Sequence, residues 1–244
     1  MWNIFKKEFW AFFNTPTGYI IVGLFLFAIA LFLWVIPGEY NVLDNGYANL
    51  DGLFYMAPWF FLFLCPAVTM RLFAEEYQQG TIELLLTRPI SRSSIVLGKF
   101  FAGWVLVLIA LIPTLVWYVS VLFLAEPFGN VDSGAFWGAF IGLALLSAVY
   151  TSIGLFASSI SSNQLISFVL AVVICFAFFY GFELLGSLFS NGDTAYAIQS
   201  VGIHAHYKSM CRGVIDSRDL VYMIILSALF IFLTQYVITP KKKR

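Results

Sequence analysis

Six long apolar stretches dominate the pattern of hydrophobic and polar positions along the chain. An α-helix rises about 1.5 Å per residue and the hydrocarbon core of a bilayer is about 30 Å thick, so a helix that crosses it needs about 20 mostly apolar residues. Stretches of this kind occupy residues 18–36, 53–73, 100–124, 135–157, 165–188 and 220–239. The pattern therefore predicts an all-α integral membrane protein with six transmembrane helices, which form a single membrane domain over residues 1–244.

Aromatic residues recur at helical spacing before the first apolar stretch. They are Trp2, Phe5, Phe9, Phe12 and Phe13, whereas Lys6, Lys7 and Glu8 fall on the other face. This amphipathic pattern is typical of a helix that lies along a membrane surface. The sequence therefore predicts an N-terminal elbow helix over residues 2–13. The alternative, in which these residues continue the first span, is disfavoured by Pro16, because the residue before a proline tends to leave the helical conformation.

The composition agrees with a membrane location. Hydrophobic residues make up 61% of the chain and charged residues 11%, whereas soluble domains carry roughly a quarter charged residues. The formal net charge is zero, so the chain lacks the strong positive charge that is typical of nucleic-acid-binding proteins. We therefore expect membrane lipids as its surroundings and no nucleic-acid partner.

Lysine and arginine are distributed unevenly over the predicted loops. With a cytoplasmic N-terminus, three of the 13 fall outside, namely Lys208, Arg212 and Arg218. The remaining ten fall inside: Lys6, Lys7, Arg71, Arg88, Arg92, Lys99, Lys241, Lys242, Lys243 and Arg244. Because short cytoplasmic loops carry the excess of positive residues, we expect a multi-pass protein of the cell's inner membrane with both termini in the cytoplasm.

One predicted inner loop, residues 75–99, is much longer than the others and carries a short apolar segment, residues 82–86. Gly80 and Thr81 form a plausible helix start with Glu83 in the first turn, and Pro89 a plausible stop. A helix this short is unstable alone in water, so the apolar side formed by Ile82, Leu85 and Leu86 needs a surface to pack against. That surface belongs either to the inner ends of the same protein or to a second protein.

The sequence of this loop, FAEEYQQGTIELLLTRPISRSSIVLGK, closely resembles the segment after the second span in permease subunits of type-2 ATP-binding-cassette (ABC) exporters. The six spans, the elbow helix and the outer segment 189–219 are similar to the same family. The resemblance implies that a coupling helix in this loop contacts the ATPase. The coupling residues that it implies are Glu75, Glu76, Gly80, Thr81, Glu83, Leu85, Leu86 and Pro89.

The resemblance also implies the partners. The phosphate-binding pattern G-x-x-x-x-G-K-[ST] is absent, since Gly98 and Lys99 are followed by Phe100, so ATP hydrolysis is expected on separate ATPase subunits and the chain itself is expected to be non-catalytic, without cofactors. A second permease subunit, identical or related, is expected to pair with this one chiefly through the first and fifth spans. The N-terminal segment FKKEFWAFFNTPTGYI looks most like the gliding-motility-associated group of these permeases.

Three ionisable residues mark a candidate outer gate. Glu183 is the only acidic residue within a predicted span, and an ionisable group in a membrane is a functional candidate, although capping by solvent at the outer end is the simpler interpretation. His204 and His206 lie in the outer segment, which the family resemblance places at the exit gate. A metal site is not expected, because the two histidines share a face only on a strand and no compact ligand set surrounds them.

Gly134, Gly138 and Gly142 recur at every fourth position at the start of the fourth span. Small residues at this spacing allow two helices to approach closely. The stripe is compatible with packing inside one subunit, which we favour, and with a contact between two subunits.

Together these features predict a membrane permease subunit of an ATP-driven transporter, linked to gliding motility, that forms its substrate path with a second permease. The alternative is a membrane scaffold that uses the same ATPase to assemble or move a cell-surface machine without transport. The transporter hypothesis predicts a polar path between paired subunits, lined partly by the second and fifth spans. The scaffold hypothesis predicts no such path. An intramembrane enzyme is disfavoured, because no paired carboxylates or catalytic constellation appear near mid-membrane.

Overall fold

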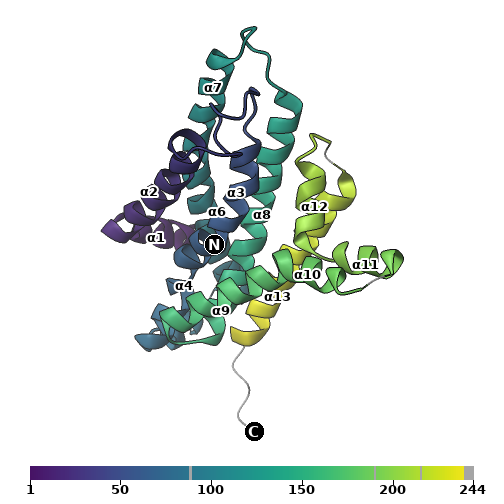
Figure 1. The fold of residues 1–244 in the computed structure, drawn as a ribbon. Helices are drawn as coiled ribbons and strands as arrows, with labels where there is room; N and C mark the ends of the chain where they lie inside the picture. The colour runs from purple at the N-terminus through teal and green to yellow at the C-terminus, as the bar shows by residue number, and fades with distance from the viewer. Residues whose placement is uncertain (88–89, 190, 215, 239–244) are drawn as a thin grey trace.

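The computed structural model describes residues 1–87, 90–189, 191–214 and 216–238, and all regular secondary structure in these ranges is helical (Figure 1). The first half contains α1 (Trp2–Phe13), α2 (Pro16–Ala30), the π-helical segment η1 (Leu31–Val35), α3 (Asp51–Thr69), α4 (Arg71–Gln78), α5 (Ile82–Leu86), α6 (Arg92–Leu111), the 3₁₀ turn η2 (Ile112–Thr114) and α7 (Leu115–Leu124). The second half contains α8 (Ser133–Ile160), α9 (Gln164–Phe176), the π-helical segment η3 (Ala177–Gly181), α10 (Phe182–Ser187), α11 (Gly192–Gln199), α12 (Ile203–Met210) and α13 (Ser217–Ile238).

The predicted all-α class with six spans is confirmed in the described residues. Helical segments long and apolar enough to cross a membrane are Pro16–Val35, Asp51–Gln78, Arg92–Leu124, Ser133–Ile160, Gln164–Ser187 and Ser217–Ile238. We call the end of the bundle with α4 and α5 the inner end and the end with the α7–α8 connection the outer end, following the predicted orientation; they lie at the bottom and top of Figure 1. Residues 239–244 and Pro89, part of the sequence predictions, lie outside the described residues.

Two helices extend further at the inner end than the apolar pattern predicts. The second span continues to Gln78 and the third begins at Arg92, so the predicted loop 75–99 is reduced to residues 79–91. The extensions carry Glu76 and Lys99, whose side chains pair with each other. Because this pairing compensates both charges, the two helices continue past the point where a hydropathy pattern stops.

The second span bends where α3 passes into α4. The helical ladder is intact up to Met70, whose N–H group donates to the carbonyl of Pro66 at 2.8 Å, and is interrupted directly beyond it. Ser158 of α8 occupies the bend: its hydroxyl accepts hydrogen bonds from the backbone N–H groups of Phe73, at 3.0 Å, and Ala74, at 3.1 Å, and donates to the carbonyl of Met70 at 2.9 Å. A side chain of the fourth span therefore completes the backbone hydrogen bonding of the second.

The centre of the molecule is α8, which packs against α3, α6, α9, α12 and α13. Close approach depends on glycine: a Cβ atom built on Gly154 would lie 2.1 Å from Oγ1 and 3.1 Å from Cβ of Thr69 on α3. Thr69 is fully buried, and its hydroxyl donates to the carbonyl of Cys65 at 2.8 Å. Little space therefore remains between the second and fourth spans.

The small-residue stripe on α8 packs inside the subunit. A Cβ atom on Gly138 would lie 2.9 Å from Cα of Gly213, and one on Gly142 would lie 3.3 Å from Cβ of Met210. Both neighbours belong to α12 or to the turn that follows it, so the stripe holds α12 against the outer half of α8 (Figure 1).

The N-terminal helix α1 lies against the inner part of α6, with Ile4 close to Gly98. Its aromatic residues form a partly exposed stack from Trp2 through Phe5 to Phe9. One part of the predicted pattern is wrong, because Glu8 does not share the outward polar face but points into the bundle toward Lys99. The ion pair explains the difference, since a carboxylate can be buried where a cation meets it.

We predict that Gly154→Ala lowers the stability of the purified protein by about 1–3 kcal/mol, because the added methyl group overpacks the contact with Thr69. Gly23→Ala is the matched control: it also changes a helical glycine in a span, but no atom lies within 4 Å of its Cβ position. Thermal unfolding in detergent checks both. Equal melting temperatures for the two variants would contradict the packing described here.

Candidate functional site

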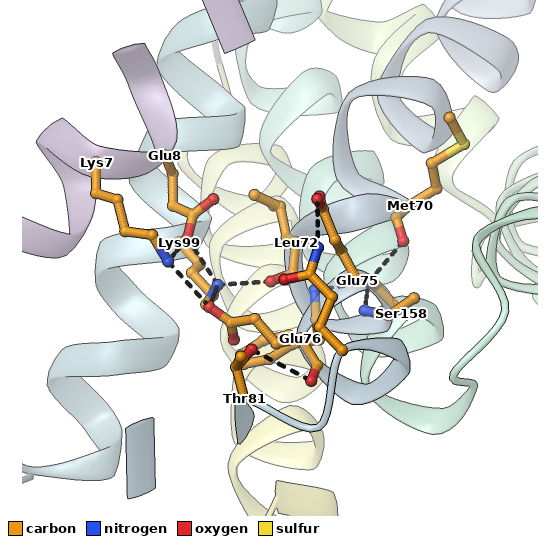
Figure 2. Close-up of polar contacts among 12 residues, drawn as sticks. Lys7, Glu8, Met70, Leu72, Glu75, Glu76, Thr81, Lys99 and Ser158 are labelled. Atoms are coloured by element: carbon orange, nitrogen blue, oxygen red, sulfur yellow. Dashed lines mark hydrogen bonds and ion pairs between the residues drawn. The ribbon is translucent and has the colours of Figure 1, made fainter. Parts of the chain in front are cut away.

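A buried ion cluster occupies the inner end of the bundle (Figure 2). The ammonium group of Lys99 on α6 lies 2.8 Å from Oε1 of Glu8 on α1 and 2.9 Å from Oε1 of Glu76 on α4. It also donates a hydrogen bond to the backbone carbonyl of Leu72. The Lys99 side chain is 1% exposed. One cation therefore joins the elbow helix to the inner ends of the second and third spans.

All three donors of the Lys99 ammonium group have an acceptor, which is the condition under which a buried lysine is tolerated. The ring of Phe73, with its centroid 5.0 Å from Nζ, adds a cation–π contact. Removing one partner would leave a charge of the other sign buried and uncompensated. The cluster therefore holds three chain segments in one arrangement.

Lys7 closes the cluster on its solvent side. Its ammonium group lies 3.4 Å from Oε1 of Glu76 and 3.6 Å from Oε1 of Glu8, and its side chain is largely exposed. Burial alone lowers the pKa of Lys7, but the two carboxylates outweigh it, so the pKa is raised above its ordinary value. With two lysines and two glutamates, the cluster has no net charge.

The turn after α4 sets the direction of α5. The N–H group of Thr81 donates to the carbonyl of Glu76 at 2.9 Å, and that of Gly80 to the carbonyl of Tyr77 at 3.2 Å. These two bonds form a Schellman motif, which requires a left-handed residue directly after the helix. Gly80 meets this requirement with φ of +68°. The Schellman motif thus ends α4 and turns the chain sharply into α5.

The short helix α5 packs on its own protein. Ile82 is buried and Leu85 half-buried against an apolar cluster that also contains Ile95 and Phe100. The surface that the sequence analysis required for this side is therefore supplied by the same chain. Leu84, which was not among the predicted coupling residues, is 67% exposed, and Glu83 beside it is also exposed. The side chain of Leu86 lies outside the described part of the structure.

The predicted coupling residues thus divide into inward and outward groups. Glu76 and Leu85 face the bundle, whereas Glu75 is half-exposed and accepts a hydrogen bond from Gln79 at 3.1 Å. Sequence reasoning missed Glu8 and Lys99 as members of this site. The available signal was a single lysine among apolar residues at the start of the third span, a position where a cation needs a partner.

The outer candidates separate into two pairs. Nδ1 of His204 lies 2.8 Å from Oε2 of Glu183, while Nδ1 of His206 lies 2.7 Å from Oδ1 of Asp219 at the start of α13. Burial, opposed by the Glu183 carboxylate, lowers the pKa of His204 below its ordinary value. Glu183 and His204 line an outer cavity, whereas His206 stacks on Tyr222 away from it.

Comparison with known protein families gives one match. The sequence model of the family described as "ABC-2 family transporter protein" matches residues 2–238, almost the whole chain. The matched range includes both the inner ion cluster and the outer cavity. A search of curated proteins finds no match.

We predict that Lys99→Met destabilises the protein by about 3–5 kcal/mol, because it leaves Glu8 and Glu76 buried without a compensating cation. Lys6→Met is the matched control. Lys6 is exposed on α1, and its ammonium group lies over the ring of Trp2 without an ion pair in the described part of the chain. Denaturant unfolding in micelles compares the two. The Lys6 variant is expected to behave like wild type, and an equally mild effect at Lys99 would show that the cluster does not hold the inner end together.

Proposed function

This chain belongs to the ABC-2 family of transporter proteins and is a membrane permease of an ABC transporter, and we propose that it receives the movement of a separate ATPase through α5 and pairs with a second permease subunit. The family implies association with ATPase subunits and with membrane lipids. The proposal concerns which surfaces make these contacts and what they transmit.

The outward side of α5 is the observation that carries the ATPase contact. Leu84 is 67% exposed at the inner end, beyond the apolar part of the spans, and Glu83 lies beside it. An exposed leucine next to a carboxylate suits a protein surface better than a lipid surface, because burying the charge in hydrocarbon is costly. The inward side of the same helix is held by Ile82 and Leu85. A partner that binds the outward side therefore binds a supported helix.

A rigid connection leads from α5 to the spans. The Schellman turn at Gly80 ties α5 to α4, and the ion pairs of Lys99 tie α4 to α1 and α6. Ser158 then links the bend above α4 to α8. Movement of a docked ATPase against α5 would be passed to these elements as a rigid-body displacement, which is a common form of switching.

The second permease subunit is proposed to contact the first and fifth spans. In each of these, 22% of the apolar window is buried inside the subunit, compared with 72% in the fourth span. Both spans also flank α3, since the ring centroid of Phe25 lies 5.5 Å from that of Phe61, and the centroid of Phe176 lies 6.4 Å from that of Trp59. Pairing through α2 and α9 would place the exposed side of α3 at the centre of the complex.

The exposed side of α3 bears on the choice between a transporter and a non-transporting scaffold. Between Asp51 and Arg71 this helix carries no charged residue, and its exposed residues include Tyr55 and Phe63. A polar path along the second span is therefore absent from its described surface. This observation favours an amphiphilic or apolar cargo, and it also keeps the non-transporting scaffold as a second candidate. Either role is compatible with a link to gliding motility, which rests on the resemblance of the N-terminal segment and the loop.

We predict that Leu84→Asp abolishes co-purification of the ATPase, reducing its recovery about tenfold or more, because a charge replaces the apolar contact at the centre of the docking surface. Leu43→Asp is the matched control: Leu43 is 62% exposed but lies in the outer loop between η1 and α3. The recovered partner must bind and hydrolyse ATP. Normal size-exclusion profiles establish that both variants are folded, and retention of the ATPase by the folded Leu84 variant would contradict docking at α5.

A further inference from the structure

A cavity of about 700 Å³ opens at the outer end between α3, η3, α10, α12 and the start of α8. Its walls are two helical stripes that face each other. On α3 the stripe runs from Asp51 through Tyr55 to Trp59, and the other runs from His204 and Lys208 on α12 to Arg212 in the turn that follows it. Trp59 is eight positions after Asp51, so the cavity reaches about 12 Å along α3.

The deeper part of the cavity is aromatic. Trp59 and Tyr180 meet edge to face with ring centroids 5.4 Å apart, and Phe179 lies beside them against Trp59 at 5.6 Å. Tyr55 lines the same wall and is 57% exposed. These rings offer apolar faces to a ligand without the entropy cost of ordering flexible side chains.

The mouth of the cavity carries uncompensated charges of both signs. Lys208 on α12 and Arg212 in the turn after it are four positions apart, and no carboxylate lies within ion-pair distance of either among the described residues. Asp51 and Asp132 line the mouth as well. Each accepts one hydrogen bond from its neighbourhood, Asp51 from Asn49 and Asp132 from the N–H group of Ala135, and neither has a cation within ion-pair distance in those residues.

We propose that this cavity binds a zwitterionic amphiphile with a phosphate and a primary ammonium group, of which an ethanolamine phospholipid is the representative. Lys208 and Arg212 receive the phosphate, Asp51 and Asp132 accept hydrogen bonds from the ammonium group, and the deeper aromatic wall contacts the apolar part. The inference rests on the proposed function in one respect, the orientation that places this cavity at the level of the outer lipid headgroups.

The charges select among lipid headgroups. An anionic lipid such as phosphatidylglycerol satisfies the two cations but leaves the two carboxylates unpaired. Phosphatidylcholine satisfies the cations, but its quaternary ammonium group cannot donate a hydrogen bond to Asp51 or Asp132. Of the three, the ethanolamine headgroup alone combines a phosphate with a cation that donates hydrogen bonds, and so compensates the charges of both signs at the mouth.

The test is a titration of the purified full-length chain in detergent with short-chain phosphatidylethanolamine, phosphatidylglycerol and phosphatidylcholine, read out by native mass spectrometry. We expect the ethanolamine lipid to bind about tenfold more tightly than either of the others. Glycerophosphoethanolamine, which carries the headgroup without acyl chains, should bind far more weakly, because it cannot use the aromatic wall.

Paired variants separate the two halves of the mouth. Lys208→Ala with Arg212→Ala should weaken all three lipids, whereas Asp51→Asn with Asp132→Asn should remove the preference over phosphatidylglycerol by removing the charge repulsion. Asparagine remains an effective N-cap at position 132, so the start of α8 is retained. Arg218→Ala and Asp193→Asn, which change charges outside the cavity lining, serve as controls.

Equal binding of the three lipids, or equal effects of the control variants, would overturn the inference. Because the titration uses the chain without any ATPase, its outcome is independent of the docking experiment on α5. Selective lipid binding by a chain that recruits no ATPase would preserve the cavity assignment and overturn the coupling proposal. Recruitment of an ATPase by a chain that shows no lipid preference would preserve the coupling proposal and overturn the cavity assignment.

Discussion

The inner half of this protein depends on the burial of one ammonium group, that of Lys99. At the edge of a membrane a buried cation must find acceptors within the protein, and here three acceptors come from two helices: Glu8 of α1, and Glu76 and the carbonyl of Leu72, both of α4. Since none of the three can move away without exposing a charge to an apolar environment, their relative positions are fixed. The helix α5, the turn that precedes it and the surface it presents all follow from that arrangement.

The two ends of the molecule are connected through α8. At its inner end Ser158 completes the backbone hydrogen bonding of the second span and Gly154, about one turn away, admits Thr69, while at the outer end Gly138 and Gly142 admit α12. The same helix therefore supports both the inner end, which carries α5, and one wall of the outer cavity. This offers a physical route by which displacement at α5 could change the shape of the cavity, because close-packed contacts transmit strain rather than absorb it.

Apolar periodicity was sufficient to predict the six spans, the elbow helix and the existence of α5, because each is a local pattern. It could not predict contacts between distant residues: Lys99 and Glu8 are 91 positions apart, and a hydropathy pattern treats both only as interruptions. For the same reason the helices ending at Gln78 and beginning at Arg92 are longer than predicted. The pairing of His204 with Glu183 and of His206 with Asp219 depends on how α12 lies against α10 and α13, which spacing along the chain does not specify.

The most direct test of the shared role of Lys99 is hydrogen–deuterium exchange in the Glu8→Gln variant. The substitution changes only α1, yet Glu8 is connected through Lys99 and Glu76 to the segment from Gly80 to Thr87. If the cluster holds these elements as one unit, backbone amides should exchange faster in both α1 and that segment, because local opening follows cooperative structural units. Faster exchange confined to α1 would contradict the account.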